Sequence, residues 1–184
     1  MKSLDDIWDE YINNDKLKSQ TISDLAWHID NDIDPAGAIT MATDMGLKEL
    51  GPHIASQLEN EDDYIRELSV GCLLGGLRLS EYAEKGFKMA REDSYDNVRA
   101  LALFSLGEVL DKIEDKNLQF KIASYIYHVL TKVDLDLYES FRGEAYYSIL
   151  IAMGIPASER PRVRDLDNSI DSFLVEQFKK KYGI

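Results

Sequence analysis

The sequence predicts an all-α protein, and three observations lead to that prediction. No stretch alternates apolar and polar residues over the length of a strand, and no Asn-Gly or Asp-Gly hairpin signal occurs. Apolar residues recur instead at steps of three and four, the spacing of a buried helix face. The prolines are few, and each stands where a helix can begin or where two helices are joined: Pro35, Pro52, Pro156 and Pro161.

The first two helices begin at polar capping residues. Ser3 and Asp6 have the spacing of a capping box, which starts a helix that runs to about Asn13. Thr21 and Asp24 offer a similar start to a second helix, whose apolar residues recur at helical spacing.

The third helix has the clearest boundaries. Asp34 supplies a capping oxygen, and Pro35 suits the first helical turn. Gly46 suits a left-handed C-terminal cap, so the helix should end there. Short helices are expected to begin at about Pro52, Ser80 and Asn117. Longer helices are expected to begin at about Glu61, Tyr95 and Leu137. The last helix should run over about residues 169–181.

Composition excludes several classes of protein. The 184 residues suit one domain with a self-sufficient core, and a single cysteine cannot form an internal disulfide or a Cys-based zinc site. With 34 acidic against 21 basic side chains, the net charge of −13 argues against a nucleic-acid binder, because phosphates need a basic footprint. No apolar run approaches the roughly 20 residues that span a bilayer, and residues 1–6 lack the apolar core of a signal peptide. We therefore expect a cytoplasmic protein without a cofactor.

A repeat lies in the middle of the chain. Residues 63–69, 96–102 and 139–145 align without gaps. Each segment has an acid, an arginine three residues later, and an apolar residue just before that arginine. The arginines are Arg66, Arg99 and Arg142, and the residues six positions before them are Asn60, Asp93 and Asp136.

Apolar and small residues continue in register through the three copies. They form one stripe at steps of three, four and seven, as an amphipathic helix requires. Its small members allow neighbouring helices to approach closely. The stripe consists of Ile65, Leu68, Ser69, Cys72 and Leu73 in the first copy, of Val98, Leu101, Ala102, Ser105, Leu106 and Val109 in the second, and of Phe141, Ala145, Ser148, Ile149 and Ala152 in the third.

This pattern resembles the HEAT-repeat family of armadillo-type helical repeats. The resemblance rests on Asp93, Val98, Arg99, Ala102, Leu106 and Gly107 and covers about residues 47–154. It implies an α-α superhelix, a short solenoid of antiparallel helix pairs, in which the recurring Asp and Arg side chains form a ladder between repeats. It also implies a single domain over residues 1–184. In that domain, helices within 1–46 and a linker and helix within 155–184 act as atypical caps, which a stack of hairpins needs at its ends.

The sequence departs from an even repeat in three places. The arginines are 33 and 43 residues apart, and the helix from Pro35 to Gly46 has no matching arginine. Glu144 occupies the position held by Leu68 and Leu101. An ionised carboxylate there, if buried, needs a partner. Two interpretations remain open: a functional buried acid, or a third repeat that is bent or shifted.

No sequence motif predicts catalysis or a metal site. Asp30, Asp32 and Asp34 have the spacing of a calcium loop, but Pro35 replaces its glycine and Met41 its closing glutamate, so the segment is expected to cap a helix. The remaining candidates are interpreted as structural: widely separated histidines, a cysteine on the core stripe, glycines in a helical context and acids at a helix start. They are His28, His53 and His128; Cys72; Gly71, Gly75 and Gly76; and Glu61, Asp62 and Asp63.

Charge is unevenly distributed along the chain. Residues 1–67 carry 16 acidic and five basic side chains, whereas residues 68–184 carry 18 and 16. Either the asymmetry arose by chance, or a basic protein partner docks at the N-terminal half. Aromatics near the helix starts could add contacts, since such side chains are enriched at binding hot spots. The predicted partner-binding residues are Glu59, Glu61, Asp62, Asp63, Glu67, Tyr95, Asp96 and Tyr138.

These observations favour a non-enzymatic protein-binding module. Its narrower form is an inhibitor or immunity protein for a basic partner. Two alternatives stay open. One is an enzyme or enzyme accessory resembling phycobilin lyases, which need a pigment pocket, or DNA glycosylases, whose basic groove the charge disfavours. The other is a structural subunit that stacks on itself in an assembly.

Overall fold

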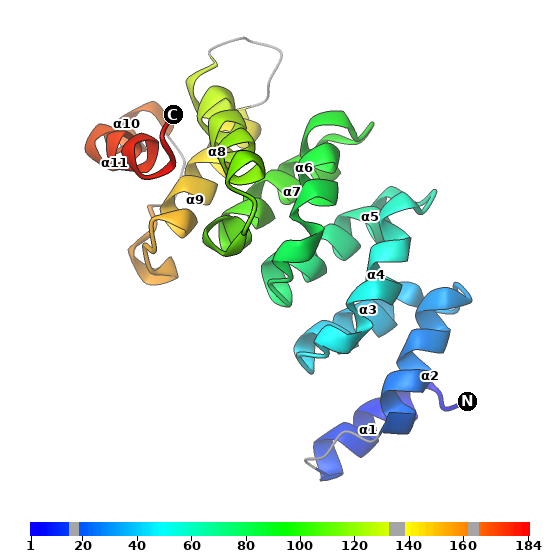
Figure 1. Cartoon of the computed structure of the whole chain (residues 1–184). Helices are drawn as coiled ribbons and strands as arrows, with labels where there is room; N and C mark the ends of the chain where they lie inside the picture. The colour runs from blue at the N-terminus through cyan, green and yellow to red at the C-terminus, as the bar shows by residue number, and fades with distance from the viewer. Residues whose placement is uncertain (15–18, 133–138, 162–165) are drawn as a thin grey trace. The chain divides into compact units, whose positions relative to one another are not determined.

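The structure is a computed structural model that describes residues 1–14, 19–132, 139–161 and 166–184 (Figure 1). Every regular element within these ranges is a helix, so the all-α prediction is confirmed. The chain divides into two compact units, Met1–Leu79 and Ser80–Ile184. The single repeat domain expected over residues 1–184 stays a prediction.

The first unit is a series of short helices. Its α-helices are α1 (Leu4–Asn14), α2 (Ser19–Asp30), α3 (Pro35–Asp44), α4 (Gly51–Ser56) and α5 (Asp63–Val70). Its 3-10 turns are η1 (Lys48–Leu50) and η2 (Gln57–Glu59). A π-helical stretch, η3 (Gly71–Gly76), continues α5. The expected start near Glu61 therefore falls at Asp63, and the π-helical stretch supplies the remainder of the longer helix predicted there.

Local chemistry sets the boundaries of α3. The Asp34 carboxylate accepts a hydrogen bond from the backbone N–H of Gly37 at 3.0 Å, and Pro35 lies in the first turn. After the helix, Gly46 adopts a φ of 68°, which favours glycine. Asp30 contacts the His53 imidazole at 2.9 Å. The acidic loop thus caps the next helix, as its structural interpretation predicts, and Asp30 also forms a hydrogen bond with His53.

The second unit contains the longer helices. They are α6 (Ala83–Glu92), α7 (Asp96–Val109), α8 (Lys116–Thr131), α9 (Glu139–Ala152), α10 (Leu166–Ser169) and α11 (Ser172–Tyr182), with 3-10 turns η4 (Ser80–Tyr82), η5 (Leu110–Lys112) and η6 (Ala157–Glu159). The 16 residues of α8 exceed the 14 of α7 and α9, so the expectation of a short helix near Asn117 was wrong. Asp115 caps this helix by accepting the backbone N–H groups of Asn117 and Leu118.

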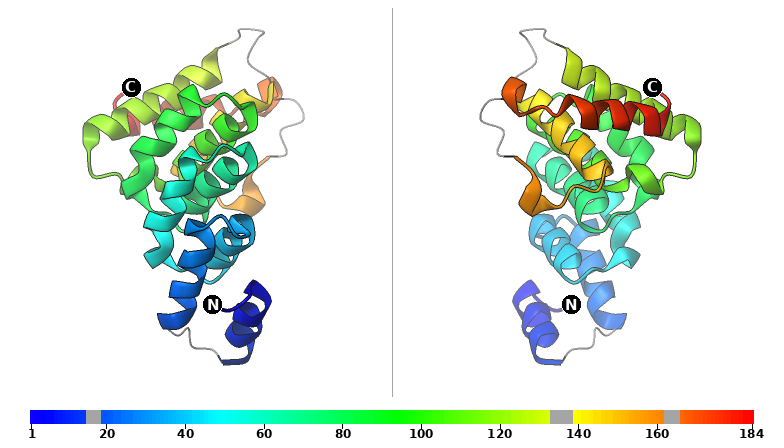
Figure 2. Two further views of the ribbon diagram at one scale, coloured as in Figure 1. Left: turned by 90° about the vertical axis from the view of Figure 1, so that its right-hand side faces the viewer. Right: turned by 90° about the vertical axis from the view of Figure 1, so that its left-hand side faces the viewer.

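Helix α7 lies at the centre of the second unit. It packs against both α6 and α9, and α8 packs on α9. Helix α11 lies along α8 and α9 (Figure 2). The hydroxyl of Tyr182 donates to the Asp111 carboxylate at 2.5 Å, and Lys181 contacts the same carboxylate at 2.7 Å. These contacts fasten the last helix to η5.

The aligned acids mark three helix starts. Helices α5, α7 and α9 begin at Asp63, Asp96 and Glu139, the first residues of the three aligned segments. The repeat is therefore present in the local structure, and the fold is compatible with a helical repeat. The side chain of Glu139 lies outside the described residues.

Burial follows the predicted stripe with one exception. Ile65, Val98 and Phe141 are buried, as are the small residues that follow them in each copy. The position shared by Leu68, Leu101 and Glu144 is only half-buried in all three helices. The buried stripe of each helix is therefore narrower than predicted. The Glu144 side chain is partly exposed to solvent without a bend or shift of its helix.

Small side chains allow two helix pairs to approach closely. A methyl group built on Gly107 of α7 would lie 2.8 Å from the backbone Cα and O of Ser148 in α9, and one on Gly76 would collide with Thr43 of α3. The Ser148 hydroxyl donates to the carbonyl of Leu103 at 2.7 Å, which joins α9 to α7 directly. Close approach is thus a property of both units.

Replacing Gly107 by alanine should lower the free energy of unfolding by about 1–3 kcal/mol, because the new methyl group meets backbone that cannot rotate away. Helix propensity alone predicts a higher free energy of unfolding, since alanine is favoured over glycine in a helix by roughly 1 kcal/mol. Chemical denaturation measures the difference. Ser105→Ala, on the same helix, removes a buried hydroxyl that has no hydrogen-bond partner among the described residues and should be neutral or stabilising. Stabilisation by Gly107→Ala would contradict the close contact.

Candidate functional site

Acidic side chains gather where η2 leads into α5. Glu59, Glu61 and Asp62 are exposed, while Asp63 and Glu67 are half-buried. Tyr64 stands among them with 59% of its surface exposed. We define these six residues as the α5 acidic surface. Five of the predicted partner-binding residues lie in it, and Tyr64, which is not among the predicted residues, belongs to it as well.

Hydrogen bonds hold the loop that presents these acids. The Asn60 side-chain oxygen accepts the backbone N–H of Asp62 at 2.9 Å, and the Asp62 carboxylate accepts the N–H of Tyr64 at 2.9 Å. Side chains of this type commonly form such turns and helix caps. The Asp62 carboxylate therefore has a structural role as well as a charge.

Arg66 secures the same loop from inside the unit. Its side chain is buried, and Nη1 donates to the carbonyls of Asn60 at 2.8 Å and Glu61 at 3.0 Å. Hydrogen bonds from a charged donor are among the stronger ones in proteins. The acids on the outer side of the loop are thus presented on a fixed backbone.

The negative charge of this surface is not neutralised by its neighbours. Within the ranges that the structure describes, no lysine, arginine or histidine forms an ion pair with Glu59, Glu61, Asp62, Asp63 or Glu67. A cationic ligand would therefore find carboxylates that are free to pair, close to an exposed phenol ring.

An equivalent turn begins α7 in the second unit. The Asp93 carboxylate accepts the backbone N–H of Tyr95 at 3.0 Å, as Asn60 does for Asp62 at the aligned positions. Tyr95 is 51% exposed, and Asp96 pairs with Arg99. Tyr95 and Asp96 therefore belong to the second unit and not to the α5 acidic surface. Tyr138, the remaining predicted contact, lies outside the described residues.

Each arginine of the predicted ladder makes a contact close to its own helix start. Arg66 binds loop carbonyls, Arg99 pairs with Asp96, and Nε of Arg142 donates to the carbonyl of Leu130 at 3.1 Å. Arg142 thereby caps the last turn of α8. Asp136 lies outside the described residues, and the ladder between repeats stays a prediction.

The histidines and the cysteine have structural surroundings. His28 is buried, with Nδ1 and Nε2 each 2.9 Å from a backbone carbonyl oxygen, of Ile33 and of Lys2. His128 is exposed. Cys72 is buried, and burial raises the pKa of its thiol, which makes it a poor nucleophile at neutral pH. Among the residues described, no three His, Cys, Asp or Glu side chains gather in a metal-binding group.

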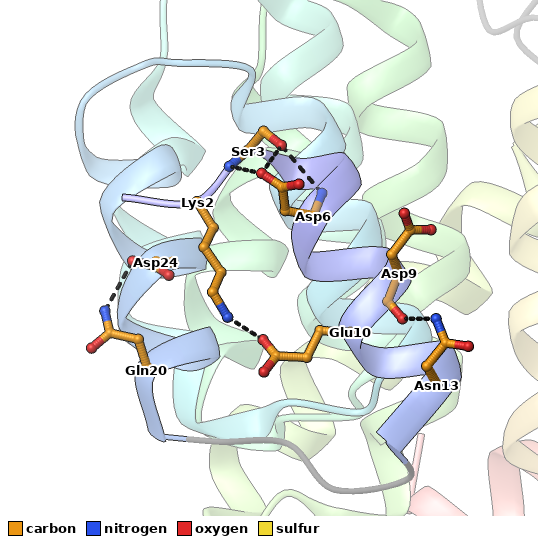
Figure 3. A network of polar contacts seen from close by, with 8 residues as sticks. All are labelled: Lys2, Ser3, Asp6, Asp9, Glu10, Asn13, Gln20 and Asp24. Atoms are coloured by element: carbon orange, nitrogen blue, oxygen red, sulfur yellow. Dashed lines mark hydrogen bonds and ion pairs between the residues drawn. The ribbon is translucent and has the colours of Figure 1, made fainter.

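Polar contacts also fix the N-terminal segment. Figure 3 shows Lys2 reaching along α1 to pair with Glu10, and the Ser3 hydroxyl paired with Asp6 at the helix start. The backbone N–H of Asp6 donates back to the Ser3 hydroxyl at 3.2 Å. The capping box predicted at this helix is therefore present.

No protein-family model, curated protein or solved structure matches this chain. No helix in the described ranges is long and apolar enough to cross a membrane. The assignment of a function therefore depends on the surfaces of the molecule itself.

Glu144 is the acid with the most perturbed surroundings. Burial raises the pKa of its carboxyl group, and no donor in the described structure bonds to it. A desolvated carboxyl group of this kind can take part in proton transfer.

Replacing Glu144 by glutamine should raise the free energy of unfolding at pH 7. Because its folded-state pKa is raised, the folded wild-type protein binds this proton more tightly than the unfolded chain does. Wild-type stability should therefore rise as pH falls from 7 through the folded pKa, and the variant should lack this rise. Urea denaturation at pH 7 and at about pH 5 would measure the difference. The exposed Glu84→Gln on α6 is the control, and an advantage that does not shrink at lower pH would contradict the assignment.

Proposed function

We propose that the chain is a non-enzymatic protein-binding module whose α5 acidic surface binds a basic protein partner. One observation supports the proposal above the others: in the first unit, carboxylates that have no ionic partner among the described residues lie within five residues of an exposed tyrosine. Such a surface attracts a cationic partner over long range, and a tyrosine supplies contact area at low entropic cost.

The fixed backbone strengthens this proposal. The hydrogen bonds of Arg66 and Asn60 hold the loop before any partner arrives. A binding surface that is already ordered loses less conformational entropy on association. The Arg66 guanidinium is buried, so it adds little exposed positive charge that would repel the partner.

Charge distribution supports a narrower form of the proposal, in which the protein is an inhibitor or immunity protein. The first unit carries 16 acidic and six basic side chains, and the second 18 and 15. The charge thus lies mainly in the unit that presents the α5 acidic surface. An acidic protein that covers the active surface of a basic enzyme would inhibit it by exclusion.

The other candidates remain predictions. A phycobilin-lyase-like or glycosylase-like activity would be carried by a ligand pocket or a basic groove, and a structural subunit by self-complementary surfaces. A bound chromophore in the purified protein would favour the lyase-like activity over the proposed one.

Neutralising Glu59, Glu61 and Glu67 to glutamine should weaken partner binding by roughly tenfold, because each exposed charge pair contributes about 0.2–1 kcal/mol. Asp62 and Asp63 are kept, so that the start of α5 is preserved. The partner is captured from the native source at low salt, identified by mass spectrometry and titrated by calorimetry. Its affinity should fall as salt rises.

A matched control removes the same charge elsewhere. Glu114, Glu159 and Glu176 are exposed acids of the second unit. Their replacement by glutamine should leave the affinity nearly unchanged. Equal weakening by both triple variants would show that total charge governs binding, and an affinity insensitive to salt would also contradict the proposal. If the partner is an enzyme, a stoichiometric amount of this protein should abolish its activity.

A further inference from the structure

An open groove of about 510 Å³ lies between α6 and α8. Phe87 and Leu118, both half-buried, form its apolar part. The ring of Phe87 packs edge-on against Tyr125, with ring centroids 5.6 Å apart, and the hydroxyl of Tyr125 donates to the carbonyl of Ala90 at 3.0 Å. These contacts connect α8 to α6, so the groove has fixed walls.

Basic side chains surround this groove. Lys85, Lys88 and Arg91 approach it from α6, and Lys121 approaches it from α8, against only Glu84 and Glu92. Arg91 pairs with Glu92 and stacks over Phe87. In the described part of the chain no carboxylate pairs with the three lysines. A groove of net positive charge in a protein of charge −13 indicates an acidic ligand.

Helix α1 carries a surface of the opposite character. Its inner side is marked by Ile7, which is fully buried. Trp8 and Ile12 are 37% and 60% exposed, although they are large and apolar. The exposed Asp5 and Asp9 lie at helical spacing beside them. We call Asp5, Trp8, Asp9 and Ile12 the outer face of α1.

The outer face is held in place by the contacts of its own helix. The Ser3–Asp6 cap and the Lys2–Glu10 pair both lie on α1 (Figure 3). The Lys2 carbonyl contacts the buried His28 of α2. Trp8 packs on Tyr11, with ring centroids 5.7 Å apart. The apolar side chains are therefore displayed on an ordered helix, ready to bind without refolding.

We propose that the outer face of α1 in one copy of this chain binds in the α6–α8 groove of a second copy. Trp8 and Ile12 cover the apolar floor of the groove, while Asp5 and Asp9 pair with its free lysines. This arrangement is a helix-in-groove contact, in which apolar residues one or two turns apart provide the anchors. It uses neither the α5 acidic surface nor the basic partner proposed above.

The contact joins two different surfaces, so it is heterologous. A third copy can add to the free groove or free α1 of the first two, and the complexes grow as rings or filaments. One helix face buries less than the roughly 1,200 Å² typical of stable complexes. The association should therefore be reversible and dependent on concentration.

Two full-length double variants test the proposal. Lys85→Glu/Lys88→Glu reverses the charge of two groove lysines and leaves α1 unchanged. Asp9→Lys/Ile12→Lys replaces an acidic and an apolar residue of the outer face of α1 and leaves the groove unchanged. All four side chains are exposed, and circular dichroism and thermal unfolding check that the fold is intact. Light scattering after size exclusion measures the mass of each sample. A third variant, Lys132→Glu/Lys180→Glu, makes the same charge change at two exposed lysines that do not line the groove, one directly after α8 and one in α11.

The wild-type mass should rise with concentration, and the third variant should behave like wild type. Each of the first two variants should stay monomeric alone. A 1:1 mixture of them should give a heterodimer and nothing larger, because only one productive contact is left in the mixture. A monomeric wild-type protein, assembly of either variant alone, loss of assembly in the third variant, or a mixture without heterodimers would each overturn the proposal.

Discussion

Close approach of helices at small side chains is the constraint on which both units depend. In the first unit Gly76 lies against Thr43, and in the second Gly107 lies against the backbone of Ser148. Most helices here have fewer than 15 residues, and isolated helices of that length are marginal in water. Their stability comes from burying one stripe against a neighbour. A larger side chain at Gly107 would meet the backbone of Ser148 and push α7 and α9 apart, whereas one at Gly76 would meet the side chain of Thr43.

Much of this organisation could be predicted from the sequence because it is local. The aligned acids mark helix starts, and the aligned Asn60 and Asp93 form the same turn, since both features need only residues within one helical turn. The start of α8 was expected close to its true position, Lys116, so the error in its length lies at its end, Thr131. The half-burial shared by Leu68, Leu101 and Glu144 was also missed, because spacing alone does not tell how wide a buried stripe is.

The candidate surfaces also differ in whether they could be predicted from residues close together in the sequence. The acids before α5 were found because they are consecutive in the sequence. The α6–α8 groove was not found, because Lys121 is distant in sequence from Lys85 and Lys88 and only packing places them around one hollow. The repeated step of three between Lys85, Lys88 and Arg91 was the one available signal. Exposure of Trp8 and Ile12 was likewise hidden, since apolar residues at helical spacing usually face a core.

The π-helical stretch after α5 has a consequence for how such a chain can change over time. Cys72, Leu73 and Leu74 are buried together within it, as Ser148, Ile149 and Leu150 are in the α-helix α9. A π-helical turn holds more residues than an α-helical turn, so one inserted residue can be absorbed there while α5 keeps its start at Asp63. Such an insertion alters the distance to the next helix start by one residue and leaves both helix starts undisturbed.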